Sequence, residues 1–418
     1  MENRVVITGL GVVSPIGIGV GQFWKAALEG RSGITAIRSF DPFPMETYRS
    51  RIAGQVADFN PSQYLEAVHA ERVDRYAQFA LTAVKEALAD SGLRMEEETP
   101  HRVGVIVGAC MGGMVMGERE ITTLYRNQKP HRVHPNFIPV ITLNSASGIV
   151  AVAHGAKGPN LTISTACSSS AHAIGKALTC IRTGQADVVI TVGAEACITP
   201  LVFAGFCSLR ALSTGFNNDP ARASRPFDRA RDGFVMGEGA GALILESLAH
   251  ARRRKARVYA EVAGYAATSE AYHMVIPRED GADVAATMSL ALRDAKLLPA
   301  QVDYINAHAT STPIGDAVEV RAIRRLFKTR AERVSVNATK SMVGHTLGAA
   351  GAIGAIVCAL ALDTGLVHPT VNYEDPDPDS ALHGISAETR KRPLKVALLN
   401  AFGFGSNNAA VVLKKFVR

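Results

Sequence analysis

Cys167 occupies a place in the sequence where a cysteine could act as a nucleophile. A strand-like run ends at Ser164, and a helix-like run of small residues begins at Ser168. Unpaired backbone N–H groups at a helix N-terminus favour the thiolate, so this position predicts a lowered cysteine pKa. The alternative is a buried structural thiol, which is our interpretation of the cysteines at positions 110, 180, 197, 207 and 358.

Two histidines, His308 and His345, have small neighbours on both sides. Each stands where a strand-like run gives way to a helical pattern, and α/β folds place their ligand sites at such junctions. A cysteine together with two such histidines could form a nucleophilic site. The other histidines lie in polar settings, where a solvated or structural role is the simpler interpretation.

Lys340 lies five residues before His345 in an otherwise uncharged stretch. A lysine in such surroundings needs a partner, and Asp316 and Glu319 could each supply a carboxylate. The alternative is a surface lysine in a loop.

A glycine-rich segment near the C-terminus could supply backbone hydrogen-bond donors. Gly403 and Gly405 flank Phe404 within residues 400–409, and such a backbone can turn sharply and present N–H groups. An oxyanion hole needs donors of this kind. The alternative is a simple turn.

Missing motifs argue against several other chemistries. The chain has no P-loop, no G-x-S-x-G elbow, no H-E-x-x-H and no C-x-x-C, and the run Gly237–Gly241 lacks the dinucleotide-binding spacing. We therefore expect no metal ion, and NAD binding is disfavoured.

The elements that must position these residues alternate between strand-like and helical patterns, which predicts an α/β fold with largely buried strands. The predicted strands are 5–9, 103–107, 161–164, 188–192, 243–246, 258–262, 304–306, 334–336 and 396–399. The predicted helices are 21–28, 72–90, 168–181, 284–295, 317–326 and 349–362.

The chain also contains a weak internal repeat. Residues 4–11 are echoed by 257–264, 164–170 by 340–345, and 186–194 by 395–403. This pattern predicts two related halves, residues 1–255 with the cysteine and residues 256–418 with the two histidines, sharing one core.

Composition sets the broad class of the protein. The chain has 418 residues, 47% of them hydrophobic, and a net charge of +7, which is an ordinary globular balance with a preference for an acidic partner. Six widely spaced cysteines and the lack of a signal-peptide pattern favour a reduced, cytoplasmic protein. The apolar run 347–362 is shorter than a typical membrane span and predicts a buried core helix. Aromatic residues make up only 6%, so a nucleic-acid-binding surface is disfavoured.

Taken together, these segments resemble the beta-ketoacyl-[acyl carrier protein] synthases, condensing enzymes of the thiolase superfamily. The resemblance covers essentially the whole chain. It rests on Thr165-Ala-Cys-Ser-Ser, Asn306-Ala-His-Ala-Thr-Ser-Thr-Pro, Lys340-Ser-Met-Val-Gly-His and Phe402-Gly-Phe-Gly. It implies the duplicated five-layer α-β-α-β-α thiolase-like fold, usually in a homodimer.

The resemblance also implies a decarboxylative condensation that uses no bound cofactor. Cys167 would hold the acyl chain, and His308 and His345 would stabilise the enolate formed when a malonyl thioester loses CO2. The backbone N–H groups of Cys167 and Phe404 would bind the tetrahedral oxyanion, and Lys340 would support His345.

Further roles follow from the same resemblance. Thr310 and Thr312 would bind the phosphopantetheine arm, and Met111, Phe137 and Phe206 would line the acyl tunnel, with Phe137 reaching across the dimer. Arg72, Arg132 and Arg210 fall at or near positions that dock the acidic acyl carrier protein.

Two positions depart from the family pattern. Ala309 replaces a glycine beside His308, and its methyl group would tighten the loop. Gly354 replaces a glutamate that helps to pair the lysine, so Asp316 and Glu319 would carry more of the network around Lys340.

The resulting hypothesis is an elongating synthase of fatty acid biosynthesis. The alternative is the ketosynthase of a type II polyketide, polyene or other specialised pathway, paired in a heterodimer with a chain-length subunit. A non-catalytic subunit is disfavoured because such subunits replace the cysteine. A thiolase and an initiating synthase are disfavoured because they use a different catalytic set.

Overall fold

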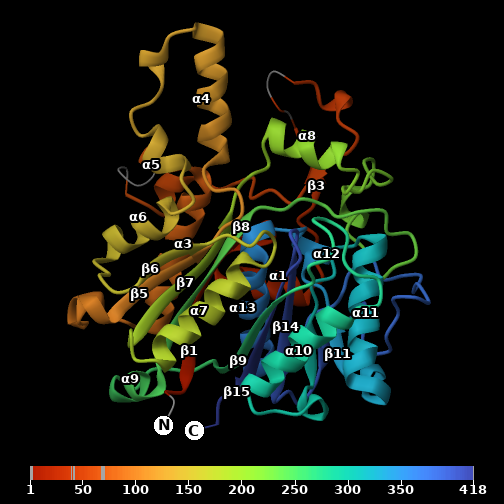
Figure 1. Cartoon of the computed structure of the whole chain (residues 1–418). Helices are drawn as coiled ribbons and strands as arrows, with labels where there is room; N and C mark the ends of the chain where they lie inside the picture. The colour runs from red at the N-terminus through yellow and green to blue at the C-terminus, as the bar shows by residue number, and fades with distance from the viewer. Residues whose placement is uncertain (1–2, 39, 41–42, 67–70, 418) are drawn as a thin grey trace.

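The computed structural model describes residues 3–38, 40, 43–66 and 71–417. Its main feature is a sheet whose strands follow the order β11-β10-β14-β15-β9-β1-β8-β7-β5-β6 (Figure 1). In the N-terminal half these are β1 (Val5–Ser14), β5 (Val103–Gly108), β6 (Asn160–Ile163), β7 (Val188–Glu195) and β8 (Gly239–Ser247). In the C-terminal half they are β9 (Ala260–Ser269), β10 (Tyr304–Asn306), β11 (Ser335–Asn337), β14 (Val396–Gly403) and β15 (Asn407–Lys415).

The two halves have the same topology. In each half the two outer pairings are parallel, β6 with β5 and β5 with β7, or β11 with β10 and β10 with β14. The two inner pairings of each half are antiparallel. The halves meet where β1 pairs with β9, between Val5 and Val262. The weak sequence repeat therefore corresponds to equivalent strands. The boundary predicted between residues 255 and 256 falls in the segment that links the two halves.

Helices cover both faces of each half, which gives five layers (Figure 1). The outer layers are α3 (Arg75–Ser91) with α6 (Ser145–His154), and α10 (Ala282–Asp294) with α11 (Pro313–Phe327); α7 (Ser169–Arg182) and α13 (Ala350–Thr364) lie between the halves. Strand β15 shows how one strand packs against helices on both of its faces. Val411 belongs to the central core beside α7 and α13, whereas its neighbour Val412 belongs to the core beside α10 and α11. Because alternate side chains of a strand enter different cores, strands of this kind are apolar on both faces.

Helix α13 is the predicted core helix. The segment Leu347–Thr364 is long and apolar enough to cross a membrane, but 89% of it is buried inside the protein. A helix that is apolar all round needs apolar surroundings on every side, and here the two sheet halves provide them. The prediction of a buried core helix is confirmed.

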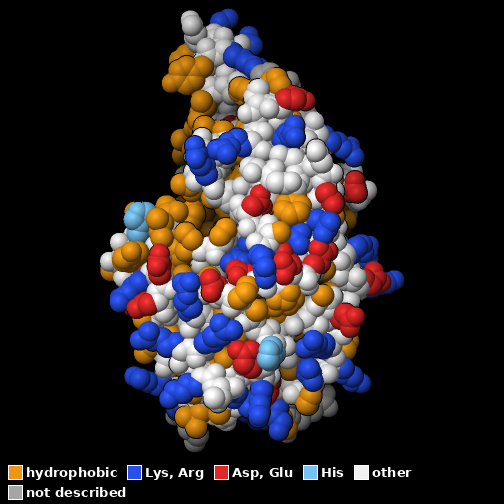
Figure 2. Space-filling view, turned by 90° about the vertical axis from the view of Figure 1, so that its right-hand side faces the viewer, with side chains coloured by type: hydrophobic (Ala, Val, Ile, Leu, Met, Phe, Trp, Pro, Cys, Tyr) orange, Lys and Arg blue, Asp and Glu red, His pale blue; other side chains and the backbone are white. Residues whose placement is uncertain are grey.

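Other elements lie around these layers. They are α1 (Val20–Leu28), α4 (Met114–Asn127), α5 (Phe137–Ile141), α8 (Pro200–Ser208), α9 (Leu248–Arg253), α12 (Lys340–Val343), and the short strands β2 (Gly17–Ile18), β3 (Thr35–Ala36), β4 (Ile52–Ala53), β12 (Leu366–Val367) and β13 (Arg390–Lys391). Helices α4 and α5 form a finger that projects from the body (Figure 1). Figure 2 shows hydrophobic side chains along one edge of this projection. Exposed hydrophobic residues of the finger include Ile121 and Tyr125 on α4 and Ile138 on α5.

The predicted strands and helices are present, but several elements were not predicted. Strand β15 was missed because residues 400–409 were interpreted as one loop. In the structure only residues 404–406 turn, and β14 and β15 form a hairpin around them. Helices α4, α5, α6 and α8 were also missed, whereas α9 overlaps residues 252–255, which the sequence indicated as a solvated helix face.

Candidate active site

Four of the residues predicted to take part in catalysis, Cys167, His308, His345 and Phe404, meet in one cavity of about 430 Å³. Cys167 follows β6, His308 follows β10, Lys340 and His345 follow β11, and Phe404 follows β14. These are the carboxyl ends of strands from both halves, where α/β proteins bind ligands. The cavity wall contains Cys167, His308, His345, Thr310, Thr312 and Phe404.

Cys167 lies on a tight turn between β6 and α7. Ala166, just before it, has a φ of +50°, a left-handed conformation that costs a non-glycine residue about 1 kcal/mol. The turn is held by Ser169, whose backbone N–H donates to the Ala166 carbonyl over 3.1 Å. The sequence therefore places the thiol at the start of α7, as predicted, and a strained backbone aims it.

The predicted lowering of the Cys167 pKa is wrong as a net effect. Burial raises the pKa of the thiol to about 12, because the side chain is almost completely removed from water. The Lys340 charge and the N–H groups of Phe404 and Cys167 lower the pKa, but by less than burial raises it. Near neutral pH the Cys167 thiol is therefore neutral, although a cation and two N–H groups beside it favour its negatively charged form.

Those two N–H groups meet at the thiol because Gly403 lets the loop come close. A Cβ at Gly403 would lie 2.5 Å from the Thr165 carbonyl oxygen and 3.2 Å from the Cys167 nitrogen, so no larger residue fits. Gly405 then turns back with a φ of +79°. A negatively charged oxygen formed next to the sulfur would therefore find two donors in place, which is the arrangement of an oxyanion hole.

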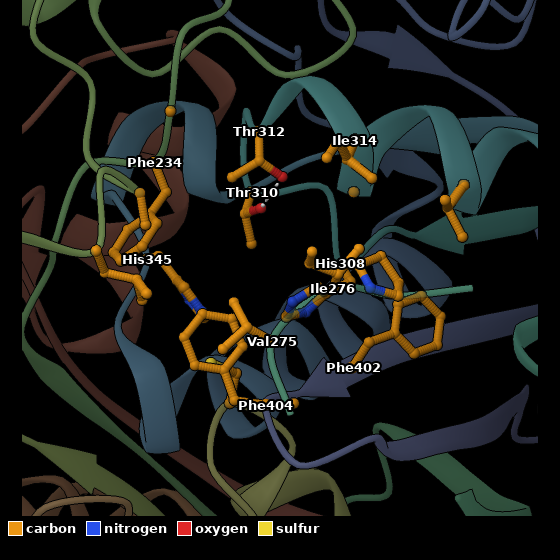
Figure 3. A pocket seen from close by; sticks show the side chains of 18 of the residues that line it. Phe234, Val275, Ile276, His308, Thr310, Thr312, Ile314, His345, Phe402 and Phe404 are labelled. Carbon is orange, nitrogen blue, oxygen red and sulfur yellow. Dashed lines mark hydrogen bonds between the residues drawn. The ribbon is translucent and has the colours of Figure 1, made fainter. Parts of the chain in front are cut away.

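His308 and His345 lie edge to face, with ring centroids 5.4 Å apart. Phe402 packs 5.4 Å from the His308 ring, and Phe234 packs 5.5 Å from the His345 ring. Burial and the nearby Lys340 charge hold the pKa of both imidazoles well below the usual value of 6.5. Both rings are therefore neutral at pH 7 and each can donate one N–H. Figure 3 shows them at the cavity wall beside Phe404.

Lys340 is buried, with 7% of its surface exposed, and burial lowers its pKa to about 8. The charge of Glu319 acts in the opposite direction. Within the described ranges, however, Lys340 has no ion pair within 4.0 Å, so the expected direct pairing with Asp316 or Glu319 is wrong. The lysine interacts with these carboxylates only at longer range.

The two carboxylates instead hold the backbone of the histidine loop. Glu319 accepts hydrogen bonds from the backbone N–H groups of His308 at 2.9 Å and Ala309 at 2.7 Å. Asp316 accepts from Ser311 N–H at 3.1 Å, and burial raises its pKa to about 7. Neither carboxylate lines the cavity, so their position is that of supports beneath the loop.

The two departures from the family pattern have local explanations. The Ala309 methyl group packs into the C-terminal core beside α10 and α11. A Cβ at Gly354 would lie 2.6 Å from both the Asn306 side-chain oxygen and a Leu399 methyl group. Asn306 in turn donates to Thr339 Oγ1 at 3.0 Å, which joins the histidine loop to the lysine loop. A polar bridge thus occupies the space next to position 354.

The predicted substrate-binding residues divide into three groups. Thr310 and Thr312 line the cavity with their hydroxyls 3.1 Å apart (Figure 3), and Phe206 also lines it. Met111 packs in the same hydrophobic cluster as Cys167 but does not form the cavity wall. Phe137 lies on α5, outside both the cavity and that cluster.

The three predicted carrier-docking arginines are all exposed. Arg210 follows α8 and lines the cavity. Arg132 ends the turn Pro130–Arg132 that follows α4, and Arg72 lies just before α3. Of the three, Arg210 alone lies at the cavity.

Glu195 is a carboxylate next to the site that sequence reasoning missed. It ends β7, is completely buried, and accepts backbone N–H groups of Cys110 at 2.8 Å, Met111 at 3.1 Å and Gly348 at 3.2 Å. Burial raises its pKa to about 7. The signal was present, because Glu195 is a carboxylate just after a predicted buried strand, residues 188–192.

The cavity lining contains further residues that the sequence did not single out. Val275 and Ile276, from the segment between β9 and α10, line the same cavity as Phe404 (Figure 3). In the part of the chain that the structure describes, no group of three His, Cys, Asp or Glu side chains could hold a metal ion.

Comparison with known proteins gives the family. Residues 2–251 match the N-terminal domain of beta-ketoacyl synthases, and residues 259–374 match the C-terminal domain. The 3-oxoacyl-[acyl-carrier-protein] synthase 2 of Synechocystis is 43% identical over 415 residues, which is 99% of each chain. The chain belongs to the beta-ketoacyl synthase family, and it is an acyltransferase with the thiolase-like fold.

Two solved structures extend the comparison. One is a ketosynthase in complex with its acyl-carrier protein, the type II PKS assembly AntDE:AntF, with 35% identity, a TM-score of 0.92 and full coverage of both chains. The other is the ishigamide ketosynthase/chain length factor, with 32% identity, a TM-score of 0.91 and full coverage of both chains.

Proposed function

We propose that this chain is an elongating 3-oxoacyl-[acyl carrier protein] synthase of fatty acid biosynthesis. It joins an acyl group held on Cys167 to malonyl carrier protein and releases CO2. The observation that carries the proposal is the meeting, in one cavity, of the Cys167 thiol, two backbone N–H donors directed at it and two neutral imidazoles.

The first step is transfer of the acyl group to the enzyme. The Cys167 sulfur attacks the thioester carbon and gives up its proton, and the carbonyl oxygen becomes an oxyanion held by the N–H groups of Cys167 and Phe404. The bond to the carrier sulfur then breaks, and the carrier leaves as a thiol with the released proton. Because burial disfavours the thiolate, the donors around Cys167 must stabilise charge as the attack proceeds.

The second step forms the new carbon–carbon bond. A malonyl thioester loses CO2, and the electrons of the broken bond form an enolate whose oxygen accepts hydrogen bonds from His308 and His345. Neutral imidazoles suit this role, since each has one N–H to donate and no charge that burial would penalise. The enolate carbon attacks the acyl carbonyl on Cys167, and the thiolate leaves as the 3-oxoacyl product forms.

The substrate arm and the carrier protein follow from the same site. Thr310 and Thr312 hold the phosphopantetheine arm within the cavity, and no bound cofactor is needed. The carrier docks at Arg210, which lines the cavity, with Arg72 and Arg132 contributing more distant positive charge. An acidic carrier suits the net charge of +7. The known ketosynthase complex with an acyl-carrier protein supports this kind of partner.

We further propose a cytoplasmic homodimer. Strand β6 forms the end of the sheet and leaves Leu161 41% exposed, while the finger exposes Tyr125 at 78% and Ile138 at 64%. An unpaired strand edge and apolar side chains are the features that an interface covers. Phe137, half-buried on the same finger, would then reach the acyl tunnel of the partner.

A second candidate function is the ketosynthase of a type II polyketide or other specialised pathway. The resemblance to the ishigamide ketosynthase/chain length factor favours it. In that case the finger and β6 would contact a chain-length subunit in a heterodimer.

The experiment mixes the purified protein with acyl and malonyl carrier proteins and identifies the product by mass spectrometry. A 3-oxoacyl chain two carbons longer is expected, and Cys167→Ala should yield none. Cys167→Gln should still release CO2 from malonyl carrier protein without condensation. Absence of product from folded wild-type protein, or equal product from Cys167→Ala, would refute the synthase proposal.

A further inference from the structure

A second cavity, of about 310 Å³, lies at the opposite end of the C-terminal strands from the active site. Asp303, just before β10, and Ser335, the first residue of β11, line it. Cys167, His308 and His345, by contrast, follow the carboxyl ends of their strands. We call this second cavity the arginine pocket, because Arg330, Arg333, Arg390 and Arg392 all line it.

The carboxylates of the arginine pocket are already engaged. Asp303 Oδ2 accepts the backbone N–H groups of Lys395 at 2.8 Å and Val396 at 3.1 Å. Glu332 accepts the backbone N–H of His383 at 3.0 Å. It also forms an ion pair at 3.4 Å with Arg324, which does not line the pocket. Both carboxylates line the pocket, so they offset only part of the charge of the four guanidinium groups and leave an excess of positive charge.

The arginines are only weakly engaged: Arg330 donates to the Val302 carbonyl at 3.4 Å. Across residues 3–38, 40, 43–66 and 71–417, no ion pair within 4.0 Å involves Arg333, Arg390 or Arg392. Arg330 reaches the Asp303 carboxylate only at 3.9 Å, and its Nε is buried without a hydrogen-bond partner. Four like charges held around one concavity repel one another, and a bound anion would relieve that repulsion.

We propose that the arginine pocket binds a small phosphate-bearing molecule carrying at least two negative charges. Guanidinium groups offer paired N–H donors that match phosphate oxygens, and four arginines line this open concavity of about 310 Å³. A small anion fits this concavity better than a protein does, because docking proteins spread their charges over broad surfaces. The carrier protein would approach the other end of the strands, where the active site opens, so this site is separate from carrier docking.

The test measures binding of inorganic pyrophosphate to the full-length protein by isothermal titration calorimetry at constant ionic strength. The test variant is Arg333→Gln/Arg390→Gln. The control is Arg252→Gln/Arg253→Gln, which removes the same charge from two exposed positions on α9. Circular dichroism and condensation activity verify that both variants are folded.

We expect saturable binding of one pyrophosphate per chain. The pocket variant should bind about tenfold more weakly or worse, since it loses two charge-assisted contacts, while the control binds as the wild type does. No saturable binding to the wild type, or equal weakening in the control, would overturn the proposal, because the first excludes a site and the second indicates nonspecific attraction.

Discussion

Replacing Glu195 by glutamine should make the stability of the protein less sensitive to pH. Glu195 is completely buried at the end of β7, and burial raises its pKa from 4.5 to about 7. An acid with a raised pKa favours the folded state while it is protonated. That stability is fully present below pH 4.5 and is lost as the pH rises through about 7. Glutamine has nearly the same shape and no proton to lose, so this loss disappears.

The size of the effect follows from the shift. A difference of 2.5 between the two pKa values corresponds to about 3 kcal/mol, most of which is lost between about pH 5 and pH 8. For a chain of 418 residues, the entropy of unfolding converts this energy to roughly 3 °C in melting temperature. The melting temperature of Glu195→Gln relative to wild type should therefore rise by roughly 3 °C over that pH range.

Differential scanning calorimetry at matched protein concentration measures this difference. The control is Glu388→Gln at an exposed position, which should change little with pH. Alkylation of Cys167 by iodoacetamide gives a second readout, because the Glu195 charge raises the pKa of Cys167. Glu195→Gln should therefore alkylate faster than wild type above pH 7. A melting-temperature difference that stays constant from pH 5 to pH 8 would refute the assignment of a buried, titrating carboxylate.

Two further changes test the surroundings of the site. Gly354→Ala should lower the free energy of unfolding by about 1–3 kcal/mol, because its Cβ would press on Asn306 and Leu399 at 2.6 Å; a denaturant titration measures this, and unchanged stability would contradict it. Lys340→Met should slow alkylation of Cys167 by iodoacetamide about tenfold near pH 7, because the lysine charge lowers the thiol pKa. An unchanged pH profile of alkylation would show that the lysine charge does not reach the sulfur.

The fold could be predicted from the sequence wherever the strands are buried on both faces. Segments such as 103–107 and 188–192 are continuous apolar runs, and that pattern leaves few structural choices. Strand β15 was not predicted for a local reason. Its first residues, Asn407 and Asn408, were interpreted as part of a glycine-rich loop. The finger helix α4 was not predicted; in the structure it packs against α5, a contact that the local sequence does not reveal.

The sequence could predict which residues form the candidate site, but not their pKa shifts or ion pairs. The residue types and strand ends placed Cys167, His308 and His345 together, and the structure brings them into one cavity. The sign of the Cys167 pKa shift could not be predicted, because burial depends on residues distant in the sequence. The same limitation explains the wrong pairing of Lys340, since only the fold decides that Glu319 binds the backbone of the histidine loop instead.

The structure also explains why the site depends on fixed dipoles more than on charges. Burial keeps the thiol and both imidazoles neutral. Lys340 is the charged group that acts on all three, and its own pKa is lowered to about 8. In the proposed mechanism, negative charge passes from the sulfur to the oxyanion and then to the enolate. Each is transient, and each would be met by N–H groups that the backbone or the rings already hold in place. Preorganised donors need no rearrangement as the charge moves, whereas a permanently charged partner would favour one of these states over the others. A site that must stabilise several short-lived anions in succession is therefore served by neutral donors around a buried sulfur.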